Sequence, residues 1–335
     1  MELNQAVLAQ FVRLAGVIFE DELKSVEMNA KNSGIFQIEN IPANSGNTRD
    51  YQEIDLEQYA DNKGEGNQAG RAKVQLGYNK VVTARRVAKD IGITIEMRQY
   101  NKYQDVVRRI SNLAKLPMRR MELDLSHVLG FGTATTYVDK NGETRDISTG
   151  ASQALWGTAH TLTGTATTYR NRLAGNPALS KGALEGIERL ATEETLNNFG
   201  EKVGNDFDVL WTTDDPVTVN TALEYLNSVA APDFANAGVT NVYKAKYKHV
   251  KLPLVATTAA GLVDNTKRRY WGLASSVMST AHLGIWEEPY LKTPADLNAG
   301  EEFSTDDWNF GVRAAYGIGV VAARGLLFSS GDATA

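Results

Sequence analysis

Apolar residues recur at helical spacing across residues 101–130. They stand three or four positions apart, or at multiples of those steps: Val106, Ile110, Leu113, Met121, Leu125 and Val128. Positions at this spacing share one face of a helix, so the pattern predicts a long amphipathic helix over residues 101–129. At about 1.5 Å per residue, this helix would be roughly 40 Å long.

Local sequence also suggests how this helix begins, bends and ends. Asn101 and Gln104 are placed to form a capping box at its start. Gly130 is placed to end it in the left-handed conformation. Pro117 predicts a bend or a break near Leu116, because proline cannot donate the helical hydrogen bond.

Residues 308–320 alternate between two kinds of side chain. One set is apolar throughout: Trp308, Phe310, Val312, Ala314, Tyr316, Ile318 and Val320. The other set is small or polar: Asn309, Gly311, Arg313, Ala315, Gly317 and Gly319. A period of two predicts a β-strand, here one much longer than usual. Because the strand and the long helix match in length, we expect one elongated layer packed on another, with residues near 205–300 inserted as a separate lobe.

Residues 61–98 predict an extended polar ribbon. The stretch from Asp61 to Asn67 is charged and rich in glycine and asparagine, which indicates an exposed tip. Residues 73–98 then show β-type alternation, which is clearest at Ile91, Ile93, Ile95 and Met97. Such an arm would reach on the order of 80 Å if fully extended. Isolated hairpins are only marginally stable in water, so this ribbon is expected to need support from outside its own domain.

The remaining elements follow from shorter patterns. Predicted helices cover 4–24, Lys181 to about Asn198 after a Ser180 cap, and Pro216–Val229 after Asp215. Predicted strands cover Ile35–Ile41, Val209–Thr213, Val242–Tyr247, Leu252–Thr257 and Trp271–Leu273. Asn141-Gly142 predicts a hairpin within Thr135–Ile147. The first helix places Val7, Phe11, Leu14 and Ile18 on one face, which suits packing on its own domain or on a neighbouring subunit.

Composition narrows the class of protein. The chain has 335 residues, enough for two moderate domains or one domain with insertions, and 42% of them are hydrophobic. Its net charge is −5, so no global positive field attracts nucleic acid. It has no cysteine, which excludes disulfides and thiolate metal sites. The N-terminal segment predicts neither a signal peptide nor a membrane-spanning helix, because Arg13 and Glu20 interrupt its apolar run.

A catalytic set is missing from the sequence. The four histidines lie far apart and share no metal-ligand spacing: His127, His160, His249 and His282. The chain contains neither HExxH nor GxSxG, and its glycine pairs do not complete GxGxxG. Adjacent carboxylates such as Asp306-Asp307 usually face water. We therefore expect no enzyme activity, cofactor or metal site, with a divergent metal-dependent enzyme as the alternative.

Basic residues cluster in pairs along the chain. Three pairs precede or occupy the long helix: Arg85-Arg86, Arg108-Arg109 and Arg119-Arg120. Glu122 follows closely, so both signs of charge lie on that helix. We interpret these residues as facing water or pairing with acidic groups across subunit contacts, and weak nucleic-acid contact is the alternative.

Three segments carry a resemblance to the major capsid proteins of tailed bacteriophages, which have the Hong Kong 97-type fold. Residues 116–122, Leu-Pro-Met-Arg-Arg-Met-Glu, resemble part of their spine helix. Residues 176–185, Asn-Pro-Ala-Leu-Ser-Lys-Gly-Ala-Leu-Glu, resemble the entry to their second helix. Residues 308–319, beginning Trp-Asn-Phe-Gly-Val-Arg, resemble their last peripheral strand. The order of the predicted elements agrees with this resemblance along essentially the whole chain.

The resemblance implies an α+β fold with named parts. These are an N-terminal arm at 1–44, an extended β E-loop at 45–98, a P-domain at 99–205 and 300–335 that holds the spine helix, and an inserted A-domain at 206–299. Because the amphipathic helix starts close to Met1, a separate scaffolding protein or a processed chain is expected. Portal proteins, decoration proteins and packaged double-stranded DNA, contacted non-specifically, are the other implied partners, and no membrane is involved.

The implied function is self-assembly into hexamers and pentamers of an icosahedral virion shell, built in the host cytoplasm. Candidate inter-subunit contacts are Phe11, Lys63, Arg85, Arg86, Arg108, Arg109, Arg119, Arg120 and Glu122. No partner environment for a covalent cross-link at Lys63 can be derived. An encapsulin-like nanocompartment shell is the main alternative, and a tail or adaptor protein is another.

Overall fold

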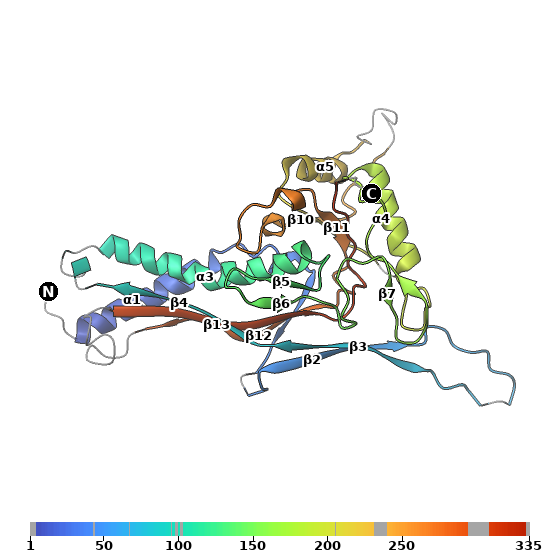
Figure 1. The fold of residues 1–335 in the computed structure, drawn as a ribbon, viewed down its shortest axis with the longest axis horizontal. Coiled ribbons are helices and arrows are strands. Elements are labelled where there is room, and N and C mark those ends of the chain that lie inside the picture. Colours follow the sequence, from blue (N-terminus) through green and yellow to red (C-terminus); the bar gives the residue numbers. More distant parts are fainter. Residues whose placement is uncertain are drawn as a thin grey trace.

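A computed structural model shows an elongated layer, a compact lobe and a projecting hairpin (Figure 1). It describes residues 5–42, 44–66, 68–94, 96–97, 100, 103–204, 206–230, 240–293 and 308–332. The elongated layer is a four-stranded sheet in the order β1-β12-β13-β4. Its strands are β1 (Phe36–Asn40), β4 (Arg85–Ile93), β12 (Ala281–Lys292) and β13 (Trp308–Val320). β1 runs parallel to β12, and the other two pairings are antiparallel.

Two helices cover this sheet. α3 (Tyr103–Gly130) lies along β13, and α1 (Gln5–Lys24) lies beside α3 (Figure 1). Apolar side chains from all three elements form one cluster: Ala15, Phe19, Val106, Ile110, Leu113, Trp308, Phe310 and Val312. The predicted packing of the long helix on the long strand is therefore confirmed.

The apolar face of α1 differs in part from the predicted one. Ala15 and Phe19 are buried, whereas Leu14 is 50% exposed. The cause is that α1 packs on α3 through the next positions around the helix. The side chains of Val7 and Phe11 lie outside the described residues, as do Asn101 and its predicted capping box.

The structure tests two predictions about α3. Of the predicted bend or break near Leu116, the break is absent, because the helix is continuous through Pro117. Gly130 is the last helical residue and is not in the left-handed conformation. A Cβ at Gly130 would lie 2.7 Å from the carbonyl oxygen of Val255. The glycine therefore allows close approach of a neighbouring backbone instead of reversing the chain.

Replacing Gly130 with alanine should destabilise the protein by about 1–3 kcal/mol, because the Val255 backbone must move. Gly186→Ala within the helix α4 (Lys181–Glu194) is a matched control, because its Cβ would meet only Leu173 at 3.6 Å. That variant should gain roughly 0.5–1 kcal/mol from helix propensity. Urea unfolding of both proteins checks the opposite signs, and a stabilised Gly130→Ala protein would contradict the close approach.

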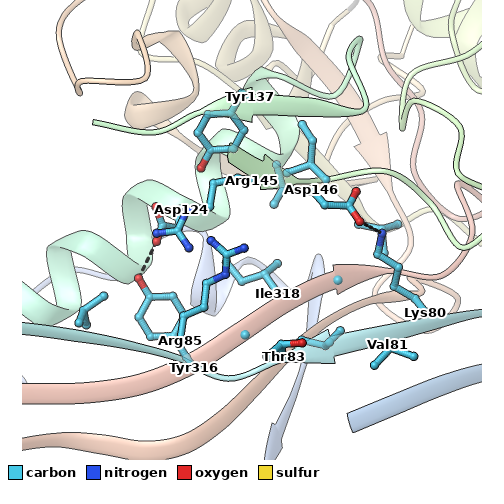
Figure 2. A pocket seen from close by; sticks show the side chains of 17 residues that line it. Lys80, Val81, Thr83, Arg85, Asp124, Tyr137, Arg145, Asp146, Tyr316 and Ile318 are labelled. Atoms are coloured by element: carbon cyan, nitrogen blue, oxygen red, sulfur yellow. Dashed lines mark hydrogen bonds and ion pairs between the residues drawn. The ribbon is translucent and has the colours of Figure 1, made fainter. Parts of the chain in front are cut away.

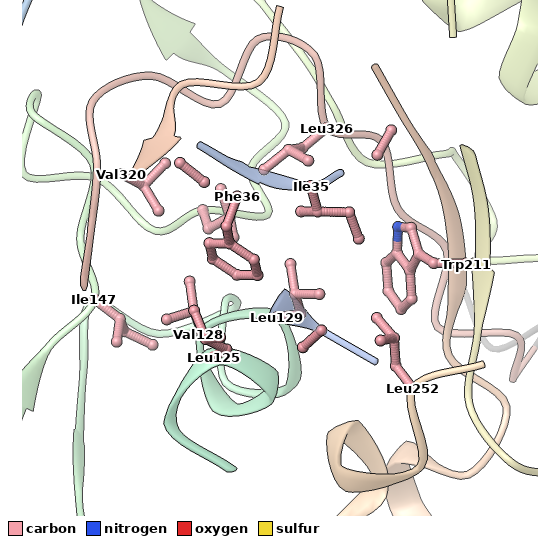
Figure 3. Packing of buried hydrophobic residues seen from close by; sticks show 14 of the residues in the cluster. Ile35, Phe36, Leu125, Val128, Leu129, Ile147, Trp211, Leu252, Val320 and Leu326 are labelled. Carbon is pink, nitrogen blue, oxygen red and sulfur yellow. The ribbon is translucent and has the colours of Figure 1, made fainter. Parts of the chain in front are cut away.

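The compact lobe contains a smaller sheet in the order β10-β9-β11. Its strands are β9 (Val209–Thr212), β10 (Lys248–Lys251) and β11 (Trp271–Ala274), with helices α4 (Lys181–Glu194) and α5 (Pro216–Asn227) nearby. A larger apolar cluster joins this lobe to the elongated layer. In Figure 3, Leu129 of α3 lies below Ile35, Leu125 lies beside Val128 below Phe36, and Trp211 of β9 lies near Leu252.

Both predicted helix caps are present in the lobe. The Ser180 hydroxyl accepts a hydrogen bond from the Ala183 amide at 3.2 Å, and the Asp215 carboxylate accepts one from the Thr218 amide at 3.3 Å. α4 ends at Glu194, before the predicted Asn198. The reason is local, because the Asn197 side chain accepts hydrogen bonds from two following backbone amides and stabilises a turn.

Two strand predictions in this region are wrong, and the strand β12 was missed. Residues 242–247 form turns, in which Tyr243 and Tyr247 both pack inward. Residues 253–256 form a 3₁₀ helix, η3, that begins at Pro253. β12 was not predicted, since Pro289 and adjacent glutamates interrupt its alternation. Register shifts at Ile285/Glu287 and Glu287/Tyr290 accommodate this interruption.

Shorter elements complete the fold. The hairpin of β5 (Thr136–Val138) and β6 (Thr144–Asp146) confirms the Asn141-Gly142 prediction, with Gly142 at φ 81°. β7 (His160–Thr161) pairs with β8 (Thr168–Tyr169), and two more 3₁₀ turns occur at η1 (Lys31–Ser33) and η4 (Asn265–Lys267). The predicted lobe strands at β9 and β11, and the strand at β1, are confirmed.

The predicted ribbon is divided between two sheets. β2 (Thr48–Leu56) and β3 (Val74–Thr83) form the projecting hairpin, whereas β4 pairs with β13 in the main sheet. The chain thus leaves the hairpin near Ala84, and the isoleucines at 91 and 93 pack within the elongated layer. Met97 lies in a helical turn, and Ile95 falls outside the described residues.

Candidate assembly surfaces

The β2–β3 hairpin turns its apolar face outward. Ile54 pairs with Leu76 across the strands, and Leu56 pairs with Val74. These four side chains, here called the outer face, are 54–60% exposed. An antiparallel hairpin lying on a protein body ordinarily buries its apolar side, so the outer face is a candidate docking surface.

The charged side of the hairpin is held by Arg324. This arginine is 6% exposed and forms ion pairs with Glu53 and Asp55 of β2, the second at 2.9 Å. The same carboxylates accept hydrogen bonds from the side-chain amide and the backbone amide of Asn198. Burial of both signs of charge together fixes which face of the hairpin meets the body.

Further contacts tie the root of the hairpin to its own chain. Lys80 pairs with Asp146 of β6 at 2.8 Å, and the Thr163 hydroxyl donates to the Leu76 carbonyl at 2.9 Å. The Trp286 indole donates to the Gly46 carbonyl at 2.9 Å. The body of the same chain thus supplies β2 and β3 with support from outside the ribbon.

The tip beyond these strands projects away from the body (Figure 1). Gln58 donates its amide to Glu201 at 3.0 Å, and the described residues from 59 to 66 are exposed. Lys63 is among them and forms no ion pair within the described part of the chain. The loop from 57 to 73 holds three carboxylates and three cations, so it has no net charge. Glu57 pairs with Lys73 at 3.8 Å, which leaves Asp61 and Glu65 as the carboxylates at the outer end.

A groove beside α3 gathers positive charge from three elements. It lies between β4, α3 and the β5–β6 hairpin, with Leu116 and Val312 among its apolar lining residues. The cations lining it are Arg85, Arg86, Lys89, Arg119, Arg120, Lys140 and Arg145. Glu143 is its acidic lining residue. We call this region the α3 groove.

The predicted arginine pairs on β4 and α3 behave differently from one another. Arg86 pairs with Glu287 at 3.2 Å while remaining 76% exposed, and Arg85 lies 3.9 Å from Glu143. Arg119 is exposed and has no ion pair among the described residues. These cations of the α3 groove are therefore available for contact with another molecule.

Arg120 and Glu122 instead face inward. Arg120 binds Asp124 at 2.9 Å and Asp139 at 2.8 Å. Glu122 is 6% exposed and accepts the backbone amides of Ala30 and Lys31, at 2.5 and 3.3 Å. Burial raises the pKa of the Glu122 carboxyl, while these hydrogen bonds oppose the rise. Both residues thus join parts of their own chain.

The third arginine pair lies near the start of α3. Arg108 is exposed, and Arg109 donates to the Gly92 carbonyl of β4 at 3.3 Å.

Sequence reasoning did not single out Arg324 or the outer face. Alternation between charged and apolar residues from Glu53 to Leu56 marked a two-sided strand, but it did not reveal which side would face the body.

Buried histidine is a further electrostatic feature of α3. Burial, with the charges of Lys267 and Arg120, lowers the pKa of His127 to about 4. Its Nε2 lies 3.0 Å from the Thr257 hydroxyl oxygen, with which it shares a hydrogen bond. The ring also makes edge contacts with Phe131 and Tyr137. The neutral imidazole is therefore the form that this packing accommodates.

His127 should make the fold acid-sensitive. An unfolded histidine binds a proton near pH 6.5, whereas folded His127 does so only near pH 4. Its contribution to stability is therefore lost as pH falls from 6.5 to 4, by roughly 3 kcal/mol in all. In urea unfolding, His127→Gln should gain about 2–3 kcal/mol relative to wild type between pH 7 and pH 4.5. A difference that does not change with pH would contradict this assignment.

Within the part of the chain that the structure describes, no three histidine or carboxylate side chains gather as a metal site would require. No helix among the same residues has the length and apolar character that crossing a bilayer demands.

Comparison with family models gives no match to this sequence, and comparison with curated proteins gives none. Among solved structures, the chain is similar to one from the procapsid of bacteriophage JBD30, with a TM-score of 0.50 and 11% identity. That alignment covers 98% of this chain and 76% of the other. The chain therefore has the α+β fold of tailed-phage capsid proteins, the Hong Kong 97-type fold expected from the sequence.

Two further similarities have slightly lower scores. The capsid of cyanophage P-SCSP1u has a TM-score of 0.49 and 13% identity, over 88% of this chain and 85% of that one. A virus-like particle from Pyrococcus furiosus has a TM-score of 0.48 and 11% identity, over 95% of this chain and 98% of that one.

Proposed function

We propose that this protein is a major capsid protein whose copies assemble into the icosahedral head of a tailed bacteriophage. Hexamers and pentamers would tile the shell and enclose double-stranded DNA. The observation that carries the proposal is the hairpin, whose outer face is apolar and whose polar tip leaves the body. Covering this exposed apolar face with another copy removes it from water, which stabilises the assembly.

Charge complementarity supports one contact between copies. Asp61 and Glu65 stand at the tip, and the α3 groove carries Lys89, Arg119 and Lys140, which form no ion pair among the described residues. The tip of one copy would lie over α3 of the next. Oppositely charged surfaces speed association and fix its register, so this contact would also orient the subunits.

The other predicted parts have roles in the same scheme. The N-terminal arm, residues 1–44, packs on its own chain through α1 and β1, so it would contact a neighbouring subunit with the exposed side of α1, which holds Leu14. The segments 45–98, 99–205 with 300–335, and 206–299 would act as E-loop, P-domain and A-domain. Arg108, Arg109 and Lys63 would lie at contacts between copies. Scaffolding, portal and decoration proteins would be further partners in the virion, and assembly would occur in the host cytoplasm without enzyme activity.

Deleting residues 61–70 tests the proposal directly. The deletion removes exposed polar residues, so the monomer should fold with unchanged urea stability. Assembly should weaken by at least about tenfold in the concentration required, because one charged contact per subunit is lost. Analytical ultracentrifugation across a concentration series measures this shift. Particles of normal yield and heat resistance from the deleted chain would contradict the proposal.

The contents of isolated particles test the proposal that the shell encloses double-stranded DNA. Particles isolated from the natural source should hold nuclease-protected double-stranded DNA. Enzyme cargo in place of DNA would support a nanocompartment shell, and rings or tubes would support a tail or adaptor protein.

A further inference from the structure

A cavity of about 180 Å³ lies where the hairpin leaves the body (Figure 2). β3 and the start of β4 form one side, β13 forms the floor, and α3 and β6 close the remaining sides. A Cβ at Gly317 would stand 2.6 Å from the Val82 side chain, so β3 crosses β13 closely at this point. The cavity therefore touches β3, β4, β13, α3 and β6 at the root of the hairpin.

Much of the cavity wall is aliphatic. The apolar lining side chains are Val81, Val82, Val87, Val128, Ile147, Ile318 and Val320. Val82, Val128, Ile147 and Val320 are at most 8% exposed, so they belong to the packed interior. The apolar part of the wall favours a ligand with a hydrocarbon segment.

The carboxylates in the cavity already have partners. Asp124 binds Arg120 and accepts the Tyr316 hydroxyl at 2.7 Å. Asp146 binds Lys80 at 2.8 Å and the Ser148 hydroxyl at 2.6 Å. These pairs neutralise the acidic groups, so the cavity offers no free negative charge to a cationic ligand.

Arg85 is the cation with the weakest pairing in this cavity. Its nearest carboxylate is Glu143 at 3.9 Å, and both side chains are substantially exposed, at 43% and 65%. Figure 2 shows its guanidinium reaching between the side chains of Tyr316 and Ile318. Because Arg85 is partly exposed, solvent reaches this end of the cavity.

We propose that the cavity binds a small monoanionic amphiphile, such as a short-chain carboxylate. The carboxylate would form a charge-assisted bond with Arg85, and the hydrocarbon tail would pack on Val82, Val128 and Ile318. A bound molecule would bridge β3, β13 and α3. It would thereby hold the hairpin root at one angle to the body. The direction of the β2–β3 hairpin would then depend on whether the ligand is bound.

Isothermal titration of the full-length chain with hexanoate tests the site. Hexanoate should bind saturably to wild type, and Arg85→Gln should weaken binding at least about tenfold through loss of the charged bond. Arg85→Lys should restore part of the affinity. Arg170→Gln should leave it unchanged, because Arg170 is similarly exposed, at 41%, and pairs with Glu194 away from the cavity. Circular dichroism establishes that each variant is folded.

Two further probes complete the test: 1-hexanol has the hydrocarbon tail but no charge, and inorganic phosphate has the charge but no tail. Neither 1-hexanol nor inorganic phosphate should bind as hexanoate does, because each lacks one half of the recognition. Hydrogen exchange of residues 80–83 should slow when hexanoate is bound. The proposal is overturned if wild type shows no saturable binding, if hexanol binds equally well, or if Arg85→Gln binds like wild type. None of these measurements depends on whether the chain forms shells.

Discussion

Replacing Arg324 with methionine should detach the β2–β3 hairpin from the body. Methionine retains much of the buried stem but leaves Glu53 and Asp55 without their cation. An uncompensated buried charge costs about 3–5 kcal/mol, which the chain avoids by swinging the carboxylates into water. Hydrogen exchange of residues 53–56 should therefore accelerate strongly, while amides in the α3–β13 layer remain protected.

Two comparison variants separate this effect from a general loss of packing. Arg170→Met removes an exposed ion pair with Glu194 and should change stability by about 1 kcal/mol or less. Adding Glu53→Gln and Asp55→Asn to Arg324→Met should restore much of the protection, because no buried charge then remains. If the hairpin amides stay protected from hydrogen exchange in Arg324→Met alone, the ion pairs do not hold the hairpin on the body.

Charging the outer face should weaken assembly more than tenfold without unfolding the chain. We expect this of the double variant Ile54→Glu with Leu76→Lys, whose opposite charges face each other across the hairpin. Both native side chains are at least 54% exposed, so monomer stability should change by only about 0.5 kcal/mol. Covering the two side chains at a contact is worth roughly 1–2 kcal/mol each, so assembly should require more than tenfold higher concentration.

A polar pair of the same hairpin supplies the matched control. Gln52 lies opposite Asn79, and both are exposed. Gln52→Glu with Asn79→Lys introduces the same two charges without removing apolar area, and assembly should persist. Sedimentation velocity of the two double variants measures the difference. Equal loss in both, or in neither, would show that the outer face is not a contact between copies.

The elongated layer was predictable because both of its main elements have strong periods. The apolar stripe of α3 runs from Val106 to Val128, and the alternation of β13 extends over its whole length. Each pattern is long enough to outweigh local exceptions such as Pro117. Caps at Ser180 and Asp215 were predictable for a different reason, since they depend on residues only three positions apart.

The missed features depend on contacts between distant residues. The sequence predicted that Gly130 would end α3 in the left-handed conformation. Its actual role, which is to allow the close approach of the Val255 backbone, depends on a distant residue. Arg324 lies about 270 residues from the carboxylates it binds, so no local pattern relates them. The strand β12 likewise depends on distant residues, because it forms by pairing with β1 and β13. The 3₁₀ helix at Pro253 was also missed.

Electron microscopy of the purified, concentrated full-length chain tests the central claim most directly. We predict closed shells in which the outer face of each hairpin is covered by a neighbouring copy. A chain that remains monomeric across the accessible concentration range, with Ile54 and Leu76 still open to solvent, would contradict it.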